Sequence, residues 1–169
     1  MHVLDESQKN TGHTAVVLLG HGSRAAEANE AMYEVVRRLQ MRWPALRLSA
    51  AFLEINAPSI PEGIDFHAYD GAGRIILLPY FLHLGNHVQR DLPGFMEEGR
   101  LRHPHVDISL SDHLGFHPKL VDIAEERLIA SLPDEGLWAG ANQPTVDNSM
   151  GDYPYEPVGA INPLDQILP

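Results

Sequence analysis

The sequence predicts an α/β fold in which a doubly wound, flavodoxin-like parallel sheet of four strands carries helices on its faces. Two observations support this prediction. Short apolar runs alternate with longer segments in which apolar residues recur at helical spacing, and this strand-then-helix order repeats four times along residues 15–131. Consecutive parallel strands joined by helices form right-handed crossovers. A chain of 169 residues is long enough for one such domain with a sizeable core.

The expected strands are runs of mostly apolar residues, typical of strands that are covered on both faces. They span residues 15–19, 47–53, 74–79 and 106–111. The apolar run 15–19 ends at Gly20, and the strongest strand pattern, Arg-Ile-Ile-Leu-Leu-Pro, ends at Pro79. Each strand should therefore deliver the residues that follow it to the same edge of the sheet.

The expected helices span residues 25–42, 57–69, 88–101 and 118–131. Ser23 is expected to cap the first helix, Pro58 and Ser59 to open the second, and Pro93 to lie in the first turn of the third or to kink it. In the fourth, the apolar residues on one face are Leu120, Ile123, Ala124 and Leu128.

The composition divides the chain into three parts. Residues 1–14 are polar, residues 15–132 form the expected α/β domain, and residues 133–169 are rich in proline and glycine without helical or alternating periodicity. We expect that last segment to be an extended tail whose removal leaves the domain folded.

The charge balance and the residue usage exclude several classes of function. A net charge of −11 argues against a nucleic-acid partner, and no segment approaches the length of a membrane span. The polar start lacks the apolar core of a signal peptide, so we expect a cytoplasmic protein. Because the chain has no cysteine, a metal site must use His, Asp or Glu.

The stretch after the first strand, Gly20-His21-Gly22-Ser23-Arg24, places a histidine between two glycines. Glycine allows a sharp turn and a close approach to a ligand, and ligands of open α/β sheets bind at the carboxyl ends of strands. The stretch matches neither the dinucleotide motif nor the P-loop, and it lacks the G-x-S-x-G elbow of hydrolases. These mismatches argue against binding of a phosphate-containing cofactor at this stretch.

Imidazoles and a carboxylate converge on this edge from four separate segments. They are His21, Glu54, His83, His87 and His113. Imidazole and carboxylate suit divalent ions such as Co²⁺, Ni²⁺, Fe²⁺ or Zn²⁺, and a site with few protein ligands keeps positions open for a substrate.

Each of these residues also has a plain structural interpretation. A histidine in a loop is usually solvated, and Glu54 could cap a helix. Arg24 and Arg90 either bind substrate carboxylates or lie in solvent. The histidines expected on the surface are His2, His13, His67, His103 and His105.

Residues 15–132 contain the motifs L-G-H-G-S-R, F-L-E, P-Y-F-L-H-L-G-N-H followed by R-D-L-P, and L-G-x-H-P. Taken together, these motifs resemble those of the class II chelatases, and most closely the small sirohydrochlorin cobaltochelatase or ferrochelatase type. The tail from Pro133 departs from the pattern of the small chelatases.

The resemblance implies a function and a site. His21 and His87 would bind the metal, Glu54 or a histidine would accept protons, and Arg24, Arg90 and Gly115 would contact the substrate. The implied reaction inserts Co²⁺, Fe²⁺ or Ni²⁺, as a substrate, into sirohydrochlorin or a related tetrapyrrole. Because the chain contains one such unit, the resemblance also implies a homodimer.

Two other functions remain open from the sequence. A protein that binds and delivers a metal or tetrapyrrole without turnover would use the same residues. A phosphohydrolase with His21 as nucleophile would need an arginine directly before that histidine, where the chain has Gly20.

Overall fold

The structure is a computed structural model, and it describes residues 12–83 and 85–132. Within helices it leaves out the side chains of Ala26, Ala28, Asn86 and His87. The chain divides into two units at Arg127 and Leu128, and the sheet belongs to the first. Most of the expected polar start and the whole expected tail, residues 133–169, lie outside the described residues. Their separation from the domain remains an expectation.

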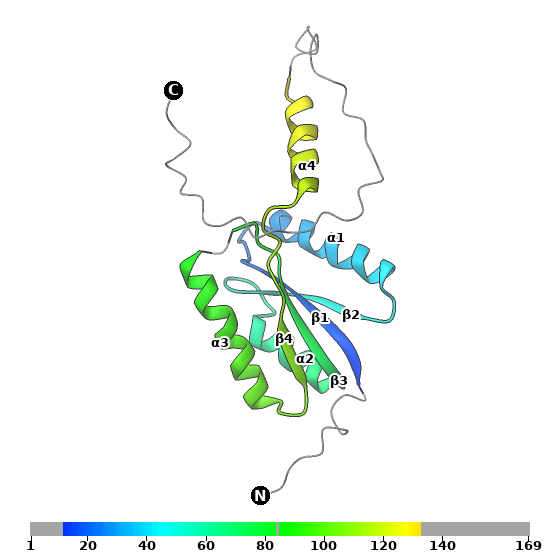
Figure 1. Ribbon diagram of the computed structural model, residues 1–169, viewed down its shortest axis with the longest axis vertical. Coiled ribbons are helices and arrows are strands. Elements are labelled where there is room, and N and C mark those ends of the chain that lie inside the picture. Colours follow the sequence, from blue (N-terminus) through cyan, green and yellow to red (C-terminus); the bar gives the residue numbers. More distant parts are fainter. Residues whose placement is uncertain (1–11, 84, 133–169) are drawn as a thin grey trace, which may run out of the picture. The chain divides into compact units, whose positions relative to one another are not determined.

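The described chain alternates strands and helices in the predicted order (Figure 1). The elements are β1 (His13–Gly20), α1 (Ala26–Arg42), β2 (Arg47–Phe52), α2 (Ile60–Tyr69), β3 (Ala72–Pro79), α3 (Asn86–Arg102), β4 (Asp107–Leu110) and α4 (Pro118–Ile129). All strand pairs are parallel, in the order β2-β1-β3-β4. The predicted fold class is confirmed.

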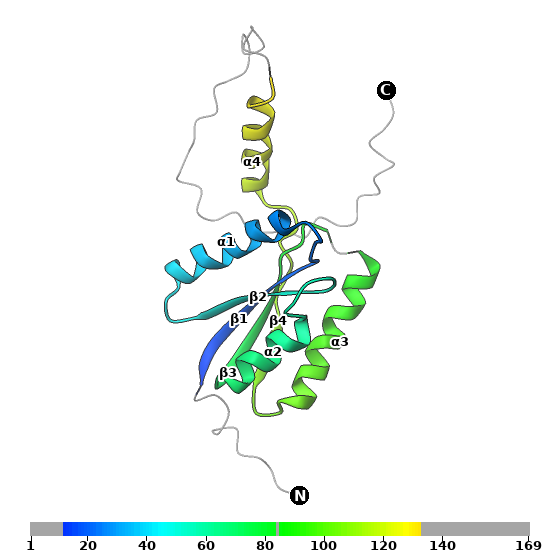
Figure 2. The ribbon, with the colours of Figure 1, turned by 180° about the vertical axis from the view of Figure 1, so that it is seen from behind.

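Helices cover both faces of the sheet, with α1 on one face and α2 and α3 on the other (Figures 1 and 2). Alternate residues of β1 enter different cores: Val17 and Leu19 belong to the core beneath α2 and α3, and Val16 and Leu18 to the core beneath α1. A strand with both faces covered has no polar face. This explains why the apolar run of β1 does not alternate.

Local chemistry sets the helix boundaries. Ser59 and Glu62 form a capping box at the start of α2. The expectation that Ser23 caps α1 is wrong, since Ala25 is the N-cap residue and Ser23 Oγ accepts a hydrogen bond from its N–H (3.1 Å). Pro93 lies inside α3, whose first residue is Asn86, two residues earlier than predicted.

Two histidines expected on the surface are buried. His67 is 2% exposed and its Nε2 lies 2.8 Å from Ser49 Oγ, whereas His103 is 5% exposed and its Nε2 lies 2.7 Å from Asp65 Oδ1. A polar partner offsets the cost of burying an imidazole. His105 is exposed as expected, and His2 lies outside the described residues.

Helix α4 forms where predicted, but its apolar face is not buried. The structure describes all of α4, and none of its residues is buried. Ile123 is 49% exposed, and Val121 is also exposed. Periodicity therefore predicted the helix correctly but not the burial of its face.

Within the described residues, no helix combines the length and the apolar character that crossing a membrane would require.

Candidate functional site

His21 follows β1 directly, at the carboxyl edge of the sheet. Its side chain is exposed, and one side of the imidazole lies against the ring of Phe81, with 4.6 Å between the ring centroids and an interplanar angle of 54°. Phe81 follows β3 and is only 5% exposed. The buried phenyl ring thus limits where the imidazole can lie, while the rest of the imidazole faces solvent.

Gly22 allows two loops to meet next to His21. Its φ is +87°, which favours glycine. A Cβ atom at this position would lie 2.2 Å from the carbonyl oxygen of Glu54 and 2.8 Å from Asn56 Oδ1. The expected sharp turn at this glycine is confirmed. Its close neighbour is the loop after β2, and a close approach to a ligand remains a prediction.

Glu54 lies in that loop, with its side chain exposed. Its backbone N–H donates to the carbonyl oxygen of His21 (3.1 Å). The alternative that Glu54 caps a helix does not hold, because Ser59 caps α2. The carboxylate is left available at the edge of the sheet, beside the histidine loop.

The loops after β3 and β4 are joined by a backbone hydrogen bond. The N–H of Gly115 donates to the carbonyl oxygen of Phe81 (3.3 Å). Gly115 is buried with a φ of +54°, and a Cβ there would lie 3.5 Å from His113 Nε2. Phe81 contacts His21, so the structure links Gly115 to the His21 loop through one intermediate residue.

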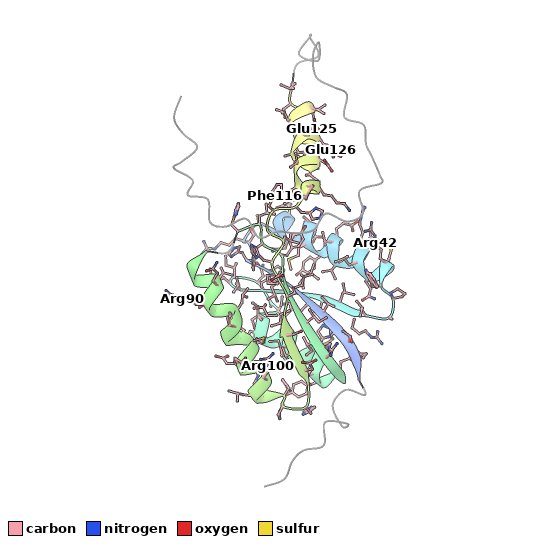
Figure 3. All side chains as sticks on the ribbon, viewed as in Figure 1. Arg42, Arg90, Arg100, Phe116, Glu125 and Glu126 are labelled. Carbon is pink, nitrogen blue, oxygen red and sulfur yellow. The ribbon has the colours of Figure 1, made fainter. Side chains whose placement is uncertain are left out.

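The other predicted residues lie around these loops. His83 is exposed after β3, and His113 borders a cavity of 250 Å³ between the carboxyl ends of β3 and β4 and helix α3. The backbone of His87 lies in the first turn of α3, and its side chain lies outside the described residues. Arg24 and Arg90 are exposed, and Figure 3 shows the Arg90 side chain directed away from the sheet.

The described side chains do not form a closed metal site. Among them, no three His, Asp or Glu residues are placed to hold one ion together, and His87 is not included in that set. A site built from His21 with one further ligand would leave the ion open toward a substrate.

The sequence did not single out two asparagines and a phenylalanine near His21. Asn56 Oδ1 accepts from the N–H of Ser23 (2.7 Å), and Asn29 Nδ2 donates to the carbonyl oxygen of Ser23 (3.1 Å). Phe81 contacts His21 itself. Asn56 precedes an Ala-Pro pair, which is a turn signal, but nothing in the sequence indicated its partner.

A family model and two relatives all relate this chain to the sirohydrochlorin chelatases. Residues 15–131 match the family model described as CbiX. A sirohydrochlorin cobaltochelatase of Priestia megaterium is 33% identical over 122 residues, which are 72% of this chain and 40% of that protein. A sirohydrochlorin ferrochelatase of the same organism is 28% identical over 145 residues, covering 82% and 54%. The chain thus spans about half the length of these relatives.

A solved structure described as a cobalamin (vitamin B12) biosynthesis CbiX protein from Marinobacter aquaeolei has the same fold. Its TM-score is 0.59 at 25% identity, over 70% of this chain and 99% of that one.

Proposed function

Because the chain belongs to the CbiX family, we propose that it is a sirohydrochlorin chelatase, which inserts a divalent metal ion into sirohydrochlorin or a related tetrapyrrole. One observation carries most weight. An exposed imidazole, His21, lies against Phe81 at the carboxyl edge of the sheet, and the loop that bears the Glu54 carboxylate is hydrogen-bonded to the backbone carbonyl of His21. A metal ligand and a base held on adjacent loops are the groups that metal insertion requires.

In the proposed mechanism, His21 and His87 hold the incoming ion with open coordination positions facing the macrocycle. Insertion releases two pyrrole protons, and Glu54 accepts protons as the metal–nitrogen bonds form. Positioning the ion and the ring supplies most of the rate enhancement. The chemistry needs no nucleotide and no redox cofactor.

The substrate carries several carboxylates, and the chain carries a net charge of −11. Binding therefore calls for local cations, and Arg24 and Arg90 are the proposed contacts, with Gly115 lining the site. Arg24 follows the His21 loop directly. The orientation of Arg90 in Figure 3 requires that its side chain turn toward the substrate on binding.

We propose Co²⁺ as the metal substrate, with Fe²⁺ or Ni²⁺ as alternatives. One relative is named for cobalt and another for iron. Comparing insertion rates for the three ions under anaerobic conditions would identify the preferred one. A homodimer and a cytoplasmic location complete the proposal.

The central test replaces each proposed ligand. We expect His21→Ala and His87→Ala each to lower the rate of metal insertion by about a hundredfold or more, because an ion with two protein ligands loses half of them. His83→Ala, an exposed histidine on the same edge, serves as the matched control and should retain most activity. The assay follows the absorbance of sirohydrochlorin, with circular dichroism to check the fold.

The same assay separates turnover from delivery. Binding of Co²⁺ and sirohydrochlorin without spectral conversion would support the delivery protein. Full activity in both His21→Ala and His87→Ala would show that the proposed site is wrong.

A further inference from the structure

We infer that Asn56 is a positioning residue that locks the His21 loop to the Glu54 loop. This inference rests on the proposed function, because it gives these two loops their roles. It concerns a residue that is not among the proposed metal ligands or substrate contacts, and that acts through the backbone of its neighbours.

The segment 21–23 is held by side chains and backbone from two directions. The carbonyl oxygen of His21 accepts from the N–H of Glu54 (3.1 Å). Two residues later, the N–H of Ser23 donates to Asn56 Oδ1 (2.7 Å), and the carbonyl oxygen of Ser23 accepts from Asn29 Nδ2 (3.1 Å). The backbone that carries the imidazole is therefore fixed at His21 and again at Ser23.

A strained turn places Asn56 for this contact. The N–H of Asn56 donates to the carbonyl oxygen of Glu54 (2.7 Å), and Ile55 between them has a φ of +69°. This is the geometry of a γ-turn with a positive φ, which is rare and costly for a β-branched residue. Ile55 is 62% exposed, so packing of its side chain does not account for the conformation.

The strain is explained if the turn must bring Asn56 to Ser23 while Glu54 stays against His21. The His21 loop and the Glu54 loop pack closely at Gly22. Asn56 Oδ1 and the Glu54 carbonyl oxygen both lie too near this residue to leave room for a Cβ. Strained residues persist where the surrounding structure over-determines them, commonly at functional sites. Here the turn makes the ligand and the base parts of one rigid unit.

The experiment compares two substitutions of Asn56. Asn56→Ala removes the acceptor for the Ser23 N–H, whereas Asn56→Asp keeps an oxygen in the same place. Gln40→Ala is the matched control, because the Gln40 side chain also hydrogen-bonds to the backbone of other residues, among them the carbonyl oxygen of Leu46 (2.8 Å) and the N–H of Leu48 (3.0 Å), at the opposite end of β2. The readouts are Co²⁺ binding by calorimetry, kcat and KM for metal insertion, and the melting temperature.

We expect Asn56→Ala to weaken Co²⁺ binding and to lower kcat, each by about tenfold or more, as substitutions behind metal ligands do. Asn56→Asp should restore both values to near those of the parent. Gln40→Ala should lower the melting temperature and leave binding and kcat unchanged below that temperature.

Two results would overturn the inference: an Asn56→Ala variant that binds and turns over like Gln40→Ala, or an Asn56→Asp variant as impaired as Asn56→Ala. His21→Ala is measured in the same series. If it is inactive while Asn56→Ala is fully active, only the positioning role fails. If it is fully active, the proposed site itself fails. Calorimetry tests the effect of Asn56 on metal binding even without turnover.

Discussion

Among single residues, His67 is the clearest case of a titratable group controlled by burial. Its imidazole lies between β2 and α2, hydrogen-bonded to Ser49. Burial lowers the pKa of His67, the neighbouring His13 lowers it further, and Asp70 opposes both. In the folded protein, protonation of this ring is therefore disfavoured relative to the unfolded chain.

This shift predicts an acid-dependent loss of stability. The unfolded chain takes up a proton near the ordinary histidine pKa of about 6.5, while folded His67 titrates below it. The contribution is fully present above that pH and is lost as the pH falls through the lowered pKa. We expect His67→Asn to make the free energy of unfolding less dependent on pH between 7.5 and 5, measured with urea at each pH.

His105→Asn provides the control for this measurement, because His105 is exposed. It should leave the pH dependence of the parent unchanged. An identical pH dependence in the parent and in His67→Asn would contradict the assigned role of burial.

At the level of elements, α2 depends on its capping box, which begins at Ser59, three residues after the γ-turn that ends at Asn56. Glu62 accepts from the N–H of Ser59 (2.7 Å) and from its hydroxyl (2.8 Å), while Ser59 Oγ accepts from the N–H of Glu62 (3.4 Å). The backbone hydrogen bond from Ser59, with the one from its hydroxyl, lowers the pKa of the Glu62 carboxyl. The capping box thereby satisfies two backbone donors at the helix start, the N–H groups of Ser59 and Glu62.

Removing the cap should destabilise the domain by a modest amount. We expect Ser59→Ala to lower the free energy of unfolding by about 1 kcal/mol, as loss of an N-cap side chain typically does. Ser59→Asp keeps an acceptor at the cap and should cost less. Urea unfolding at neutral pH measures both, and equal losses for the two variants would mean that the side chain does not act as a cap.

The elements were predictable because their signals are local. The apolar run of β3 and the periodicity of α1 depend only on neighbouring residues, so both were predicted to within two residues. The helix beginning at Asn86 was predicted to begin two residues later, and Pro93, expected in its first turn or at a kink, lies inside α3. The apolar face of α4 predicted a helix, but periodicity cannot say what covers that face.

The site was predictable only in part, because some of its contacts join residues that are far apart in the sequence. His21 and Glu54 follow strands, and parallel topology brings strand ends together. Asn56 was missed because its partner, Ser23, is 33 residues away, and no local pattern encodes that contact. His67 and His103 were placed on the surface because their polar partners, Ser49 and Asp65, are also remote in sequence, 18 and 38 residues away.

At the scale of the whole molecule, the apolar side chains of α4 are exposed, and their partner is not yet identified. The chain has one four-stranded sheet in residues 13–110, whereas the cobaltochelatase of Priestia megaterium matches it over only 40% of its own length. A second copy of the chain is the partner proposed above, and an apolar helix face is the kind of surface that a two-fold interface covers. We therefore predict that α4 contributes to the dimer.

The prediction is tested by sedimentation at micromolar concentration. Ile123 is 49% exposed, and a two-fold interface would contain this side chain twice. We therefore expect Ile123→Ser to weaken the dimer by about 3 kcal/mol, which raises the dissociation constant more than a hundredfold. Glu125 follows Ile123 by two residues and therefore lies about 200° around the helix from it, on another side, so Glu125→Ser is the matched control. We expect the parent and the control to sediment as dimers and Ile123→Ser as a monomer. A parent that sediments as a monomer while inserting metal at full rate would contradict the dimer, and an Ile123→Ser variant that stays dimeric would place the interface elsewhere.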